Sequence, residues 1–151
     1  MKEFRHAGIV VADMERALGF YRDLLGLTVV RDAEEQGEYR ERITGLPGAR
    51  ARTVKMKARN GSALVELLQF HTHPRPVEAP AETCAIGLRH IAFTVEDLDS
   101  LHRRLTEAGV RFLAPPQRSP SGREKITYCR DPEGNILELV GEIPPAGGRD
   151  S

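Results

Sequence analysis

The chain has 151 residues, 40% of them hydrophobic, and its 22 basic and 22 acidic side chains cancel. This length suffices for one domain with a substantial core, and a neutral chain without a basic stripe argues against nucleic-acid binding. The longest apolar runs fall far short of the roughly 20 residues that cross a bilayer, and the charged N-terminal segment lacks the apolar core of a secretion signal. We therefore expect a cytoplasmic protein without a membrane partner, in which Cys84 and Cys129 stay reduced.

The first predicted module covers residues 4–70 and begins with a strand of alternating character that starts at His6. Asp13 then caps a predicted helix, whose apolar residues follow the spacing of one helix face and which Gly26 ends in the left-handed conformation. The charged residues 32–50 are predicted to form a long mobile loop of the kind that carries lids or specificity elements. Three further strands are expected, at residues 27–31, 52–58 and 64–70.

The second predicted module covers residues 87–142 and repeats this order. His90 opens a strand, Asp97 caps a helix that a glycine ends, and strands are expected at residues 110–113, 125–130 and 136–142. The Pro-rich residues 71–86 are expected to link the two modules, and residues 143–151 to form a frayed tail. Each module thus has the order β-α-β-β-β, which predicts a single α+β domain over residues 1–151 built from two tandem βαβββ modules.

The two modules match in chemistry as well as in order. His6 and His90 start equivalent strands, and each module later reaches an apolar strand with one embedded acid, Glu66 or Glu138. A lone carboxylate in an apolar strand costs several kcal/mol or must take up a proton, so something has to compensate it. Because side chains alternate along a strand, each histidine shares its face with small neighbours that leave room for a cavity: Gly8, Ala92 and Thr94.

Two imidazoles and two carboxylates that converge would bind a divalent cation in a pocket enclosed by curved mixed sheet. This donor set suits Zn, Ni, Co, Mn or Fe(II), and four protein ligands leave two positions for water or substrate. A single histidine on a strand is more often structural, and a single glutamate can pair with an arginine. The repetition of both at matching places favours a metal site. The predicted ligands are His6, Glu66, His90 and Glu138.

Other candidate residues have competing interpretations. Tyr128 precedes the turn before the second acidic strand, and it either reaches the pocket to contact substrate or packs in the sheet. His71 and His73 form a His-x-His pair in the Pro-rich segment and are interpreted as linker or pocket-rim residues. His102 lies on a predicted helix and is expected to be solvated.

The chain resembles the vicinal oxygen chelate superfamily, which includes glyoxalases, bleomycin resistance proteins and extradiol dioxygenases. The resemblance rests on the first histidine strand, on residues 20–27, and on residues 128–139 with their Asp-Pro-Glu-Gly-Asn turn, and it covers nearly the whole chain. It implies that the four predicted ligands occupy the superfamily's ligand positions. The complete His-Glu-His-Glu set resembles glyoxalase-like and methylmalonyl-CoA-epimerase-like members most, although the residues after Glu66 lack the Thr and Asn of glyoxalase I.

The resemblance implies a divalent-metal-dependent enzyme of the glyoxalase or epimerase type, a lyase or isomerase acting on a small-molecule substrate. Such an enzyme moves a proton next to a metal-bound carbonyl, with Glu138 as the preferred base and Glu66 as its partner. Two alternatives stay open: a ferrous extradiol ring-cleaving dioxygenase that uses His6, His90 and Glu138, and a non-enzymatic drug- or metabolite-binding resistance dimer. A homodimer is expected, because pairing would cover exposed sheet edges.

Overall fold

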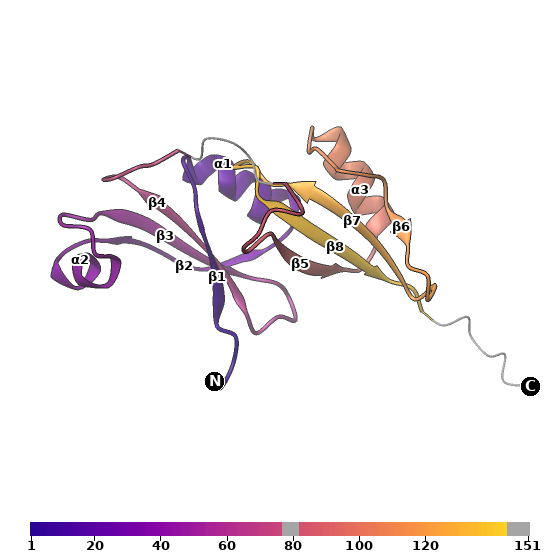
Figure 1. Ribbon diagram of the computed structural model, residues 1–151, viewed down its shortest axis with the longest axis horizontal. Coiled ribbons are helices and arrows are strands. Elements are labelled where there is room, and N and C mark those ends of the chain that lie inside the picture. Colours follow the sequence, from indigo (N-terminus) through magenta and orange to yellow (C-terminus); the bar gives the residue numbers. More distant parts are fainter. Residues whose placement is uncertain (77–81, 145–151) are drawn as a thin grey trace, which may run out of the picture. The chain divides into compact units, whose positions relative to one another are not determined.

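The computed structural model describes residues 1–76 and 82–144. The chain divides into two compact units, Met1–Ala79 and Pro80–Ser151, each of which contains one four-stranded mixed sheet with a helix on one face (Figure 1). The prediction of an α+β fold with two repeated modules is therefore confirmed. Within the described residues, no helix is long and apolar enough to cross a membrane.

The first unit pairs its strands in the order β1-β4-β3-β2. β1 runs parallel to β4, and the other neighbouring strands are antiparallel. The elements are β1 (His6–Val10), α1 (Met14–Leu18), the π-helix η1 (Gly19–Leu24), β2 (Thr28–Glu35), α2 (Glu38–Thr44), β3 (Ala51–Lys57) and β4 (Leu64–Phe70).

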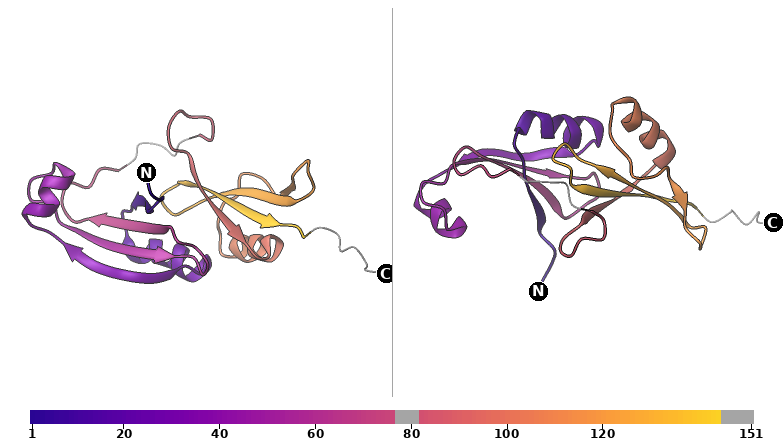
Figure 2. Two further views of the ribbon diagram at one scale, coloured as in Figure 1. Left: turned by 90° about the horizontal axis from the view of Figure 1, so that it is seen from below. Right: turned by 45° about the horizontal axis from the view of Figure 1, so that its top comes forward.

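Figure 2 shows α1 along one face of the first unit's sheet, and the core of this unit lies between them. Asp13 starts the helix by accepting a hydrogen bond from the Arg16 backbone N–H at 3.1 Å, as its capping role predicts. The helix and the sheet then bury the apolar positions Met14, Ala17, Leu18, Tyr21, Val54, Met56, Val65 and Leu67. Alternation along the strands therefore leaves the opposite face of the sheet, which carries His6, free for other chemistry.

The second unit repeats this arrangement with the strand order β5-β8-β7-β6. Asp97 caps its helix by accepting from the Ser100 backbone N–H at 2.9 Å. Gly141 lets the start of this helix approach the sheet, because a Cβ at that position would lie 2.8 Å from the Leu98 Cβ. The elements are β5 (His90–Val95), α3 (Leu98–Glu107), β6 (Gln117–Arg118), β7 (Glu124–Arg130) and β8 (Ile136–Glu142).

Two expectations about local structure are wrong. Residues 32–50 are not one long loop, because β2 continues to Glu35 along β3 and is followed by α2. Charged side chains stabilise this extension across the sheet, since Arg52 binds Asp32 through two hydrogen bonds of 3.0 and 2.7 Å. The expected strand at 110–113 contributes only an isolated bridge between Phe112 and Cys129. The edge strand β6 instead begins after the prolines that follow this segment, because proline cannot donate a ladder hydrogen bond.

Candidate metal centre

The first unit brings one predicted histidine and one predicted glutamate together. β1 and β4 are parallel neighbours in which Gly8 is the register partner of Glu66, so His6 lies on the same face two residues earlier. His6 Nε2 is 3.2 Å from Glu66 Oε2, and only 13% of the glutamate side chain is exposed. A Cβ at Gly8 would lie 4.0 Å from Glu66 Oε2, so this glycine keeps side-chain atoms away from the carboxylate.

The second unit repeats this geometry. On the parallel strands β5 and β8, Ala92 is the register partner of Glu138, and His90 again lies two residues earlier. His90 Nε2 is 3.1 Å from Glu138 Oε2, and 17% of the glutamate side chain is exposed. We call the face of each sheet that carries these pairs the histidine face. The expected placement of an imidazole beside a carboxylate is therefore present in both units.

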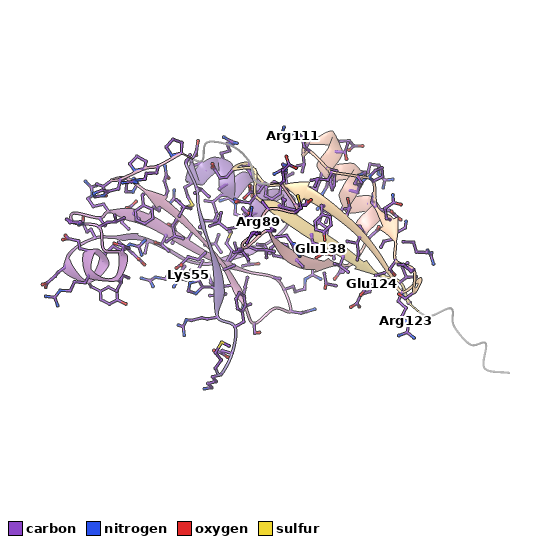
Figure 3. All side chains as sticks on the ribbon, viewed as in Figure 1. Lys55, Arg89, Arg111, Arg123, Glu124 and Glu138 are labelled. Carbon is purple, nitrogen blue, oxygen red and sulfur yellow. The ribbon has the colours of Figure 1, made fainter. Side chains whose placement is uncertain are left out.

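Each carboxylate also has a neighbour on the antiparallel strand at its other side, and here the two units differ. Lys55 is the β3 partner of Glu66, and its Nζ is 3.2 Å from Glu66 Oε1. Tyr128 is the β7 partner of Glu138, and its ring lies edge-on to the His90 ring with 5.5 Å between centroids. Figure 3 labels Lys55 and Glu138 on their strands. Lys55 was not identified as a site residue from the sequence. Lys55 occupies the position in the first module that Tyr128 occupies in the second, and this equivalence could have identified it.

The electrostatic surroundings of the two carboxylates differ accordingly. Glu66 lies between an ammonium group and an imidazole. Glu138 instead faces the phenol of Tyr128. Burial raises the pKa of this phenol above its usual value, and the charge and the hydrogen bond of Glu138 raise it further. The phenol is therefore protonated at neutral pH and can donate a hydrogen bond to the Glu138 carboxylate. Tyr128 thus lies at the candidate site rather than only packing in the sheet.

The geometry of each pair suits a shared cation. Two ligands that each bind one ion at about 2.0–2.2 Å lie about 2.8–3.6 Å apart at octahedral to tetrahedral angles. The observed nitrogen–oxygen separations of 3.2 and 3.1 Å fall inside this range. Within each unit, the described residues supply this pair and no group of three or more ligating side chains.

The remaining predicted residues lie elsewhere. His71 Nε2 contacts Glu34 Oε2 at 2.9 Å, and its backbone N–H bonds the Arg50 carbonyl, so it ties the end of β4 to its neighbours. His73 follows in the segment after β4. His102, which was expected to be solvated, is half-buried, and its ring packs on Phe112 with 4.3 Å between centroids.

The turn before β8 holds the second carboxylate strand in place. The buried Asp131 carboxylate accepts hydrogen bonds from the Glu133 and Asn135 backbone N–H groups at 2.9 and 2.8 Å, and from the Asn135 side chain at 2.9 Å. This closes the predicted Asp-Pro-Glu-Gly-Asn turn and fixes where β8 begins, two residues before Glu138.

Comparison with known proteins places this arrangement in a family. The protein YwkD of Bacillus subtilis, which is uncharacterised, is 32% identical over 92% of this chain and 96% of its own length. A probable lactoylglutathione lyase of Synechocystis is 26% identical over 89% of this chain and 92% of its own. A crystal structure of a glyoxalase family protein from Bacillus cereus superposes with a TM-score of 0.88 at 28% identity, with 95% of both chains covered. Because residues 3–139 match its family model, the chain belongs to the Glyoxalase/Bleomycin resistance protein/Dioxygenase superfamily, the vicinal oxygen chelate group that its motifs resemble.

Proposed function

We propose that the protein is a divalent-metal-dependent lyase or isomerase that moves a proton next to a carbonyl of a small-molecule substrate. The observation that carries this proposal is the repeated contact of a histidine Nε2 with a glutamate Oε2, at 3.2 Å in one unit and 3.1 Å in the other. Similarity to a probable lactoylglutathione lyase supports this class of activity over a purely binding role.

The proposed metal ligands are His6, Glu66, His90 and Glu138. Catalytic metal sites usually have three or more protein ligands, so one histidine–glutamate pair alone would hold an ion weakly. Imidazole nitrogen and carboxylate oxygen suit Zn, Ni, Co, Mn or Fe(II). When bound, the metal would stabilise the negative charge that develops on the substrate oxygen.

The different neighbours of the two carboxylates support different roles. Glu66 is held from one side by the Lys55 ammonium and from the other by His6, which favours a fixed ligand. Glu138 has the neutral Tyr128 phenol in place of an ammonium, so less holds it in position. We therefore assign Glu138 as the base that takes the substrate proton and Glu66 as its less mobile partner, with Tyr128 as a hydrogen-bond donor to Glu138.

Metal analysis tests the ligand set. Protein purified without chelator should hold about one divalent ion per chain, and His6→Ala and His90→Ala should each remove most of it. His71→Ala is the matched control, because His71 also faces a glutamate, Glu34, but lies outside the proposed set. Unchanged metal content in His90→Ala would show that the assignment is wrong. Sedimentation of the same samples tests the proposed homodimer, which a mass of one chain at micromolar concentration would exclude.

Isotope exchange tests the chemistry. With methylglyoxal–thiol adducts and acyl-CoA epimers as substrates, Glu138→Gln should abolish solvent deuterium exchange at the substrate carbon and leave binding within about tenfold. Glu66→Gln should cost less activity, because an amide oxygen can still bind the metal. Oxygen uptake with a catechol, together with no deuterium exchange on any carbonyl substrate, would instead favour the ring-cleaving dioxygenase.

A further inference from the structure

Buried polar atoms without a hydrogen-bond partner gather on the histidine face of the first unit. Among the described residues of this unit they are His6 Nδ1, Thr53 Oγ1, and the Nε and Nη2 atoms of Arg40. His6 and Thr53 lie on this face through the strand register, in which Thr53 pairs with Leu68 next to the Lys55–Glu66 pair. Arg40 reaches the same face from α2, because its guanidinium carbon lies 5.3 Å from the centre of the Phe70 ring. Buried donors are costly to leave unpaired, so these atoms indicate a missing acceptor.

The unpaired atoms of Arg40 form one edge of its guanidinium. The Arg40 side chain is 8% exposed, and its Nη1 donates to Glu35 Oε2 at 3.0 Å. The other oxygen, Glu35 Oε1, pairs with Arg31 Nη2 at 3.5 Å. This leaves Nε–H and Nη2–H, the two parallel donors that bind a carboxylate in a bidentate manner. The missing acceptor therefore has the geometry of a carboxylate group.

The spacing along β4 between Phe70, which contacts Arg40, and Glu66 sets the length of a molecule that would reach both residues. Phe70 and Glu66 share one face of β4 and are four residues apart, which corresponds to about 13–14 Å along the strand. The unpaired Thr53 hydroxyl lies on the neighbouring strand between these two levels. A molecule that extends along β3 and β4 would therefore pass this hydroxyl between its two ends.

We propose that Arg40 binds a distal carboxylate of the substrate while the reacting carbonyl end lies at Glu66. This inference rests on the proposed function, in which Glu66 is a ligand of the metal beside which the substrate carbonyl reacts. It assigns the substrate to elongated molecules with an acidic group far from the reacting carbon, and it gives α2 the role of a specificity element. Arg40 is then a binding residue, and Glu35 holds it in place.

Entry of the ligand requires the atoms around the Arg40 donors to move. The two donor atoms are buried in this structure, so the atoms that cover them must shift before a carboxylate can reach them. The outer side of α2 exposes the large side chains Tyr39 and Ile43, by 78% and 56%. The helix also lies between Gly37 and Gly45, which have positive φ angles of 94° and 69°. Binding should therefore slow amide exchange in α2 by ordering it against the sheet.

Calorimetric titration with two probes of equal chain length tests the site. Sebacate is a straight-chain dicarboxylate, and decanoate has the same number of carbons with one carboxylate. We expect zinc-loaded protein to bind sebacate at least tenfold tighter than decanoate, because only sebacate reaches both ends. Arg40→Lys keeps the charge but loses the paired donors, and it should weaken sebacate binding at least tenfold. Arg31→Lys is the matched control, because Arg31 also pairs with Glu35 but is 56% exposed, and it should change binding less than twofold.

Metal-free protein separates this inference from the proposed function. Binding of decanoate to metal-free protein that depends on Arg40, with slower amide exchange in α2, would support the carboxylate site even if zinc does not bind to the four proposed ligands. Equal sebacate affinity for wild type and Arg40→Lys, or equal losses in Arg40→Lys and Arg31→Lys, would overturn it. Arg40→Met gives a second measurement: a lower melting temperature with unchanged sebacate binding would make Arg40 a structural residue only.

Discussion

Adding one methyl group at Gly141 should destabilise the second unit by pushing α3 away from β8. In Gly141→Ala, the new Cβ would lie 2.8 Å from the Leu98 Cβ, whereas ordinary contacts begin at 3.4 Å. The helix and the strand must therefore separate by about 0.6 Å, and the contact is with a Cβ that cannot rotate away. Overpacking of this size costs about 1–3 kcal/mol of the free energy of unfolding.

Urea unfolding of a small mutant series measures this cost. Leu98→Ala keeps the Cβ, so Gly141→Ala should remain as destabilising in that background as in the wild type. Leu98→Gly removes the Cβ, so the same change should there cost nothing beyond about 0.5 kcal/mol. Gly19→Ala is the control in open space, since nothing lies within 4 Å of its added Cβ, and it should stabilise the helix by about 0.5–1 kcal/mol. An equal cost of Gly141→Ala in the Leu98→Gly background would refute the contact argument.

Three further outcomes are expected. Burial raises the pKa of the Cys129 thiol to about 12, whereas Cys84 is exposed. At mildly alkaline pH a thiol reagent should therefore label only Cys84 in native protein and both cysteines after denaturation. Two fast-reacting thiols in native protein would contradict the buried position of Cys129. The backbone N–H of Ser100 lowers the pKa of the Asp97 carboxyl, so this cap stabilises the fold above the carboxyl's unfolded pKa and loses that effect as pH falls through the lower folded value. The melting temperatures of wild type and Asp97→Ala should therefore differ at neutral pH and converge in acid. A gap in melting temperature that stays constant with pH would contradict this prediction. Asp131→Ala removes three hydrogen bonds and should lower the free energy of unfolding by roughly 2–4 kcal/mol in urea titrations, whereas a loss below roughly 1 kcal/mol would mean that the turn forms without them.

The elements with local signals could be predicted from sequence. Asp13 and Asp97 cap helices where their spacing predicted them, and the strands at 64–70 and 136–142 have the expected bounds. The prediction for residues 32–50 was wrong, because their many charged side chains are typical of a loop. The pairing of Asp32 with Arg52 on the neighbouring strand joins residues far apart in sequence, and local patterns do not reveal it.

The same difference between local and long-range contacts explains which site residues could be predicted from the sequence. The repeat located the two histidines and the two acids, because each pair occupies fixed positions on neighbouring parallel strands. Lys55 and Arg40 stayed hidden, since one depends on the antiparallel register of β3 and the other on a helix that was not expected.

The duplicated modules place the same histidine–glutamate pair in each unit, but the residue opposite the glutamate on the neighbouring strand differs. We expect this residue to decide which glutamate acts as the base. In both units a histidine Nε2 faces a glutamate Oε2 at nearly the same distance, so the two modules offer equivalent donors. The residue opposite the acid on the next strand is an ammonium in one unit and a phenol in the other. An ammonium group, which carries a full charge, holds a carboxylate more strongly than the hydroxyl of a neutral phenol does. Exchanging these two partners, with Lys55→Tyr and Tyr128→Lys in one chain, should therefore move the loss of deuterium exchange from Glu138→Gln to Glu66→Gln. If Glu138→Gln still abolishes exchange in that background, the neighbouring strand does not decide which carboxylate acts as the base.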